Sequence, residues 1–209
     1  MVCGLTTKNY NILMRSLIQQ LQNNNTFSAR AVRDFLLDQD AESTRWPSDD
    51  EFAKAWLNRP FYEVLTRARV RIVLEALELK MYTTKTEKIT IDSKLTIEHV
   101  LPQEWEEHWP LPGELAIEEA TKRREQLMHT VGNLTLVTES LNPAMSNGPW
   151  KSKKAALAEH CSMAMNRKLV AMDDWSDVAI ENRSKELFIL AKQIWPRPNA
   201  LQPRTALSL

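Results

Sequence analysis

The chain has 209 residues, of which 43% are hydrophobic and 26% charged, a composition typical of a globular protein and not of a disordered segment. Its 27 Lys and Arg residues balance 27 Asp and Glu residues, so no net charge attracts it to nucleic acids or acidic membranes. Cys3 and Cys161 form no CxxC pair, which argues against a thiolate zinc site, and no apolar run has the length of a membrane span. These features predict a cytoplasmic protein without a membrane partner.

Apolar residues recur at helical intervals in the first part of the chain. They predict helices within residues 8–22 and within 23–39. Ser48 is followed three residues later by Glu51, which is the pattern of a capping box at the start of a third helix. Pro60 is expected to end that helix, because proline cannot continue the helical hydrogen bonds. The first 80 residues are therefore interpreted as a helical scaffold.

Residues 62–81 predict one longer helix with a largely buried apolar side. The residues expected to face inward are Val64, Leu65, Ile72, Leu74, Leu77 and Leu79. β-Branched residues then become frequent and predict short strands at 88–91 and 95–100. A third short strand is expected within 130–137. With only four glycines for tight turns, the whole chain is predicted to be mainly α with a small embedded β-hairpin.

The later elements follow from similar patterns. Residues 114–128 predict a helix between the strands, and Pro149 predicts the first turn of another. Residues 173–196 predict a C-terminal helix, followed by a loose tail.

Polar residues cluster at the predicted strand ends. Glu98 and His99 close the strand at 95–100, Asn133 lies in the next strand, and Asn142 lies in the turn after it. Histidine is suited to take a proton from water near neutral pH, and phosphodiester hydrolysis also uses a hard divalent cation with oxygen ligands. Neighbouring residues of a regular strand face opposite sides, so Glu98 and His99 can share a site only if the strand ends there. Pro102 favours such an ending.

The segments IEHVLPQ, GNLTLV, LNPAMSN and WKSKK, which span residues 97–154, resemble the HNH nuclease motif. The version they resemble is the C-terminal domain of GmrSD-type restriction proteins. The two asparagines stand 142 − 133 = 9 residues apart, as they do in that motif. The resemblance implies a ββα-metal nuclease core flanked by helices, which hydrolyses DNA as the effector of a restriction or phage-defence system.

The resemblance also implies roles for single residues. His99 is the expected general base, and Glu98 and Asn142 are the expected ligands of one Mg²⁺ or Mn²⁺ ion. Asn133 belongs to the same catalytic set, where it is expected to hold the histidine loop through hydrogen bonds. Glutamate stands at position 98 where related nucleases carry aspartate, and its extra methylene weakens the ligand assignment.

The basic helix after Pro149 is the expected contact with DNA. Asn147, Lys153 and Lys154 are assigned to DNA binding, with a helix cap as the alternative role of Asn147. Lysines on a helix are by default a solvated face. The expected partner is therefore DNA, and an N-terminal nucleotide-binding domain is a further expected partner outside this chain.

Two groups of residues near the motif have structural interpretations. His129 precedes Asn133 by four residues and is interpreted as a core or turn histidine, with an accessory ligand as the alternative. Trp105, Trp109 and Trp150 are expected to pack the small core, because ββα units bury little surface of their own.

The predicted domains are a helical scaffold at 1–93, the nuclease core at 94–165, and a C-terminal helix and tail at 166–209. The competing hypothesis is a catalytically weak or inactive module that binds DNA or docks proteins on the same fold. The loss of cleavage in a His99→Ala variant distinguishes the two, since a binding module has no cleavage to lose.

Overall fold

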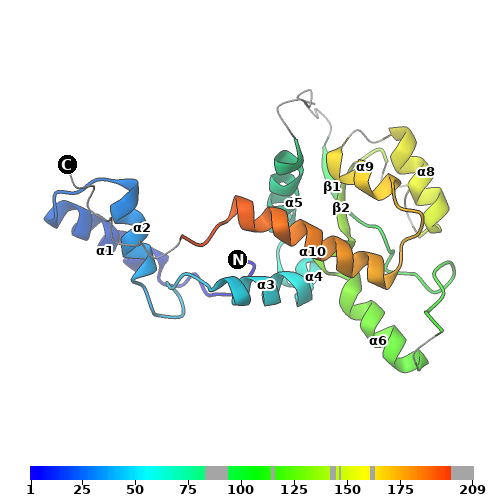
Figure 1. Ribbon diagram of the computed structural model, residues 1–209, viewed down its shortest axis with the longest axis horizontal. Helices are drawn as coiled ribbons and strands as arrows, with labels where there is room; N and C mark the ends of the chain where they lie inside the picture. The colour runs from blue at the N-terminus through cyan, green and yellow to red at the C-terminus, as the bar shows by residue number, and fades with distance from the viewer. Residues whose placement is uncertain (83–93, 114–115, 142–144, 146, 161–162, 199–209) are drawn as a thin grey trace, which may run out of the picture. The chain divides into compact units, whose positions relative to one another are not determined.

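The computed structural model describes residues 1–82, 94–113, 116–141, 145, 147–160 and 163–198 (Figure 1). It is mainly helical and contains a two-stranded antiparallel sheet, which confirms the predicted mainly α class with a small sheet, although residues 100–133 separate the two strands. No helix in these residues is both long and apolar enough to cross a membrane. The strand predicted at 88–91 lies outside the described residues.

The helices and strands follow in this order: α1 (Tyr10–Asn23), α2 (Ala29–Leu37), α3 (Asp49–Asn58), α4 (Phe61–Val64), α5 (Arg67–Met81), β1 (Leu95–His99), α6 (Ile117–Met128), the 3₁₀ turn η1 (Val131–Asn133), β2 (Leu134–Thr138), α8 (Trp150–His160), α9 (Ala164–Val170) and α10 (Asp177–Ile194). They form two compact units, one of residues 1–52 with the chain from 196 onward, and one of residues 53–195. The limits predicted at 93 and 165 both fall inside the second unit.

The first unit contains the helix pair α1 and α2. Leu13, Leu17 and Phe35 form its buried apolar cluster. Ser28 begins α2, because its hydroxyl accepts a hydrogen bond from the Ala31 amide at 3.1 Å. The unit therefore rests on a small core and on well-formed helix ends.

The predicted capping box at the start of α3 is confirmed. The Glu51 amide donates to Ser48 Oγ at 3.1 Å, and the Ser48 amide donates to Glu51 Oε2 at 2.8 Å. Each side chain thus satisfies a backbone donor that the first helical turn leaves free.

The single helix predicted over 62–81 is wrong, because the chain breaks at Thr66 into α4 and α5. Thr66 has extended backbone angles, and its hydroxyl accepts from the Arg69 amide, so it starts a new helix. Because of this break, a different set of residues faces the core. The buried apolar residues of α5 are Val70, Val73, Leu74 and Leu77, whereas Val64, Ile72 and Leu79 are exposed.

The sheet consists of β1 paired with β2. The register joins Leu95 to Thr138 and His99 to Leu134, so His99 is the last paired residue of its strand. Beyond this pair, the Val100 amide still donates to the Asn133 carbonyl at 3.0 Å. The strand therefore ends where the position of Pro102 predicts, and His99 stands at its edge.

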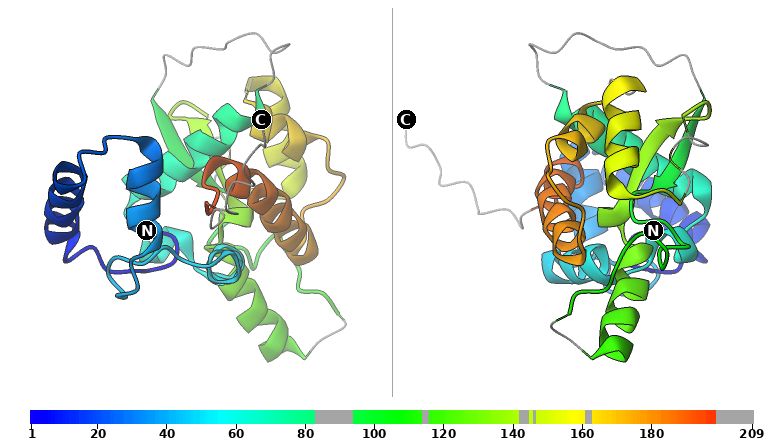
Figure 2. Two further views of the ribbon diagram at one scale, coloured as in Figure 1. Left: turned by 60° about the vertical axis from the view of Figure 1, so that its left-hand side comes forward. Right: turned by 90° about the vertical axis from the view of Figure 1, so that its right-hand side faces the viewer.

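Helices cover this sheet within the second unit. Figures 1 and 2 show α8 and α9 near the strands. The helix α10 packs against η1 and α5. The core beneath them includes Trp105 and Trp109, both buried, with Trp150 packed against it. The predicted packing role of these three tryptophans is confirmed.

Gly132 allows α10 to lie close to η1. A Cβ atom at this position would stand 2.1 Å from Ser184 Oγ and 2.3 Å from the Ile180 carbonyl oxygen. A real Cβ atom cannot approach a backbone oxygen so closely. The glycine just before Asn133 is thus required by packing.

We predict that Gly132→Ala destabilises the chain by about 1–3 kcal/mol or more, because either α10 or η1 must move. Gly113→Ala is the matched control, since a Cβ atom at Gly113 has no neighbour within 4 Å. Urea denaturation of both variants measures the difference. Equal midpoints for the two would contradict the packing explanation.

Candidate functional site

The side chain of Asn133 holds the turn that follows β1. Its Oδ1 accepts from the Leu101 amide at 2.7 Å and from Trp175 Nε1 at 3.2 Å. Its Nδ2 donates to the carbonyls of Leu101 at 2.8 Å and Met128 at 2.9 Å. With no exposed surface and its polar atoms engaged, Asn133 has a geometry that favours a positioning role over contact with a substrate.

His99 packs into a cluster of rings at the end of β1. Its Nε2 lies 3.1 Å from Nδ1 of His129, and the two rings are nearly perpendicular. The ring of Tyr62 is nearly perpendicular to that of His99 at a centroid distance of 4.3 Å and lies parallel to the ring of His129. The Tyr62 amide also donates to the His129 carbonyl at 3.2 Å. Both the position and the plane of the His99 imidazole are therefore fixed.

Two charged groups border this cluster. Glu63 Oε1 lies 3.4 Å from Nε2 of His129. The exposed guanidinium of Arg67 lies over the Tyr62 ring, 3.2 Å from its centroid, and donates to the Tyr62 carbonyl. Glu63 and Tyr62 come from α4, and Arg67 is the first residue of α5. The helical scaffold thus contributes directly to the surroundings of His99.

Burial keeps the imidazole of His99 neutral. His99 is only 7% exposed. The loss of solvent around its ring lowers the pKa of His99 to about 3, and the charges of His129, Lys153 and Arg67 lower it further by smaller amounts. At pH 7 the imidazole of His99 is therefore unprotonated.

The side chain of Glu98 contacts α8, whereas that of His99 contacts His129. Its Oε1 accepts from Lys153 Nζ at 2.8 Å, and the same ammonium donates to the His99 carbonyl at 2.7 Å. Burial raises the pKa of Glu98 and lowers that of Lys153, while the opposite charge of each partner works against these shifts. The strand alternation therefore separates the acid from the imidazole beside it.

The residues assigned to DNA binding have different surroundings. Lys153 is fully buried, and its burial argues against a direct phosphate contact. Lys154 is partly buried, and its Nζ donates to the Met172 carbonyl at 2.6 Å. Asn147 is exposed, and its amide donates to Glu104 at 2.6 Å. The DNA contacts of Lys154 and Asn147 stay predictions.

Of the two predicted metal ligands, the structure describes Glu98 but not Asn142. Asn142 lies outside the described residues, and Glu98 is paired with Lys153. Within the described part of the chain, no group of three or more His, Cys, Asp or Glu side chains is arranged to hold a metal ion. Mg²⁺ is commonly held by one or two carboxylates together with substrate phosphates and water, so a small protein donor set is still compatible with it.

Comparison with known protein families explains this arrangement. The family model for the C-terminal domain of GmrSD restriction endonucleases matches residues 46–190. The chain belongs to this family. A search of curated proteins found no match. The match contains β1, β2 and α8 as well as α4 and α5, so the site described above lies entirely inside the GmrSD-type region.

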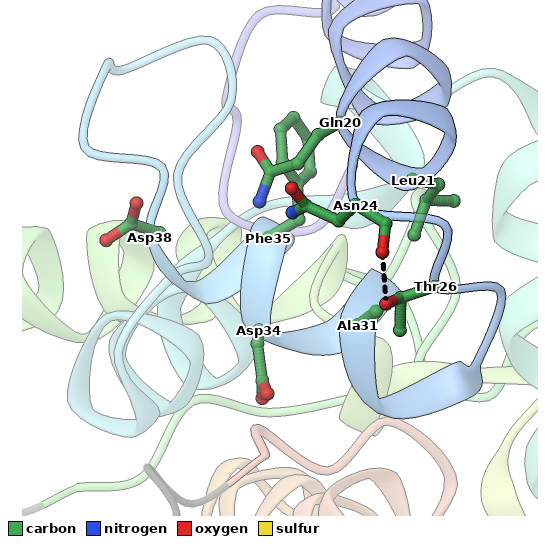
Figure 3. Close-up of a pocket in the computed structure, with 8 residues that line it drawn as sticks. All are labelled: Gln20, Leu21, Asn24, Thr26, Ala31, Asp34, Phe35 and Asp38. Carbon is green, nitrogen blue, oxygen red and sulfur yellow. Dashed lines mark hydrogen bonds between the residues drawn. The ribbon is translucent and has the colours of Figure 1, made fainter.

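A hollow in the first unit lies outside the region shared with the GmrSD family. It measures ≈ 420 Å³ and is lined by residues of α1, α2 and their C-terminal ends, including Gln20, Asn24, Asp34 and Asp38 (Figure 3). The two carboxylates point in different directions in Figure 3 and do not converge on a common point. This hollow therefore offers no arrangement for catalysis, and the site at His99 is the stronger candidate.

Sequence reasoning missed the partners of His99. His129 was interpreted as a core or turn residue, and Tyr62, Glu63 and Arg67 were assigned to the scaffold. The available signal was the position of His129 four residues before Asn133, which brings it to the end of β1 once η1 and β2 pair with that strand. No local pattern indicates that α4 packs there.

We predict that Lys153→Met destabilises the chain by about 3–5 kcal/mol, because it leaves the Glu98 carboxylate buried without its cation. The double variant Glu98→Gln/Lys153→Met should lose less than the sum of the single variants, with a coupling of about 0.5–3 kcal/mol. Urea denaturation measures these values. Lys151→Met is the control, since Lys151 is exposed on the same helix and its loss should cost under about 0.5 kcal/mol. Additive single effects would contradict the proposed pairing.

A second prediction concerns pH. The pKa of His99 is about 3 in the folded chain and 6.5 in the reference state, so the unfolded chain takes up the proton first as pH falls. The stability from neutral His99 is present above about pH 6.5 and is lost progressively toward pH 3, by up to about 1.4 kcal/mol per pH unit. Denaturation of metal-free wild type and His99→Gln at pH 7.5, 5.5 and 4.5 should show the steeper decline in wild type. Parallel declines would show that His99 titrates normally in the folded chain.

Proposed function

We propose that the chain is a metal-dependent endonuclease domain of the HNH, or ββα-metal, type that hydrolyses DNA phosphodiester bonds. The observation that carries the proposal is the position of His99, held at the end of β1 by contacts with His129 and Tyr62, in a member of a restriction endonuclease family. The order β1, β2, α8 is compatible with a ββα unit. The biological role that fits is the effector part of a restriction or phage-defence system.

In the proposed reaction His99 accepts a proton from water, and the water oxygen attacks the phosphorus. The bond from phosphorus to the 3′ oxygen breaks, and that oxygen takes a proton from solvent water, which leaves a 5′-phosphate and a 3′-hydroxyl. Asn133 supports the step by fixing the turn at Leu101, and Tyr62 supports it by fixing the imidazole plane.

The residues proposed for the divalent ion are Glu98 and Asn142, with Mg²⁺ or Mn²⁺ as the cation. A carboxylate and an amide oxygen suit such hard cations. When bound, the ion would supply positive charge against the phosphate and the leaving oxygen. The Lys153 ammonium partly neutralises Glu98, so the substrate phosphate is expected to contribute to the binding of the ion.

Arg67 is the proposed phosphate contact in place of Lys153. Its guanidinium is exposed and lies over the Tyr62 ring, which in turn packs against His99. A planar guanidinium can hold two phosphate oxygens at once. Asn147 and Lys154 remain the proposed contacts from the α8 side.

The test is plasmid cleavage in Mg²⁺, Mn²⁺ or EDTA. We expect nicking that requires a divalent ion and falls about 10²–10⁴-fold in His99→Ala, because the variant lacks the general base. His108→Ala is the matched control, since His108 is more exposed and lies outside the cluster.

Three results would contradict the proposal. Cleavage that persists in EDTA would exclude a metal-dependent mechanism. Cleavage that persists in His99→Ala would exclude His99 as the general base. A folded chain that shifts DNA but cuts it with neither ion would favour the binding module instead.

A further inference from the structure

The contact between His99 and His129 constrains which ring nitrogen of each histidine carries a proton. Nε2 of His99 and Nδ1 of His129 are 3.1 Å apart, a hydrogen-bond distance. Between two neutral imidazoles this bond holds one proton, which belongs to one ring or the other. If His129 donated, His99 would carry its own proton on Nδ1 and would have no free lone pair to act as a base.

Glu63 discriminates between these two cases. A carboxylate can only accept, and Glu63 Oε1 lies 3.4 Å from Nε2 of His129. This neighbour favours a proton on Nε2 of His129, and in the neutral ring Nδ1 is then bare. With this tautomer, Nδ1 of His129 accepts and Nε2 of His99 donates.

This proton position determines the state of Nδ1, the other ring nitrogen of His99. With its proton on Nε2, His99 has a lone pair on Nδ1. Among the described residues, Nδ1 of His99 makes no hydrogen bond. Tyr62 restricts rotation of the ring, because it packs nearly perpendicular to His99 while its amide binds the His129 backbone.

We propose that His129, oriented by Glu63, is a positioning residue that fixes the Nε2–H tautomer of His99 and so makes Nδ1 the general base. This inference rests on the proposed nuclease function for its catalytic part, while the tautomer itself is a property of the folded chain. It assigns a role to α4, which lies 30 or more residues before the histidine motif.

Histidine NMR on the metal-free chain tests the tautomer without any cleavage. With ¹³C,¹⁵N-labelled histidine, and with the His99 signals assigned by their loss in His99→Gln, wild type should show the proton of His99 on Nε2. In His129→Leu the His99 signals should shift toward a mixture of both tautomers. A proton on Nδ1 of His99 in wild type would overturn the proposal, whatever the chain does to DNA.

A matched pair of amides tests the positioning role in catalysis. In His129→Asn the amide falls near the position of Nδ1 and can accept from His99, whereas in His129→Gln it falls near the position of Nε2. We expect His129→Gln and His129→Leu to lower kcat by about 10–100-fold with KM changed less than about threefold. His129→Asn should retain most of kcat. An equal loss of kcat in His129→Asn and His129→Gln would contradict the positioning role and show that His129 only packs against His99.

Two controls complete the experiment. His108→Leu makes the same chemical change at a histidine that also has a glutamate neighbour, Glu107 at 3.8 Å, and it should leave kcat unchanged. Circular dichroism establishes that each variant is folded. If wild type cuts no DNA, the nuclease function fails while the NMR result still decides the tautomer, so the two failures are distinguishable.

Discussion

The buried amide of Asn133 is the interaction on which the rest of the site depends. It joins the turn at Leu101, the end of α6 at Met128 and the indole of Trp175 through hydrogen bonds made without solvent. A buried polar group of this kind stabilises a fold only when its partners are all present, so the three segments are fixed together. Because the Asn133 carbonyl also accepts from Val100, the same residue determines where β1 ends and therefore where His99 stands.

The buried ammonium of Lys153 makes a second connection, between α8 and β1. It reaches Glu98 and the carbonyl of His99, and Leu157 one turn later is buried on the same side of the helix. A buried ion pair is weak evidence for stability, since desolvation opposes the attraction. Its value here is geometric: it joins α8 to the last two residues of β1, because one ammonium contacts both the Glu98 carboxylate and the His99 carbonyl.

The local features of this chain could be predicted from its sequence, whereas the long-range ones could not. The capping box of Ser48 and Glu51 and the end of the strand near Pro102 depend on residues a few positions apart. The break at Thr66 was missed because apolar residues continue on both sides of it. Lys153 was assigned to the surface because a lysine on a helix is normally solvated, and only the packing of α8 on β1 brings Glu98 beneath it.

The placement of Glu98 beside His99 in the sequence invites the interpretation that the acid serves the imidazole. Strand alternation leads to the opposite result, because Glu98 is directed to Lys153 and His99 to His129. A buried imidazole still needs a polar partner for its ring nitrogens, and that partner comes from the turn before β2, supported by Tyr62 of α4. The surroundings of His99 therefore extend beyond the strand–strand–helix motif into α4 and α5, because Tyr62 packs against both histidines and Arg67 lies over the Tyr62 ring. Within this family region, the helices that precede the motif contact the candidate site directly.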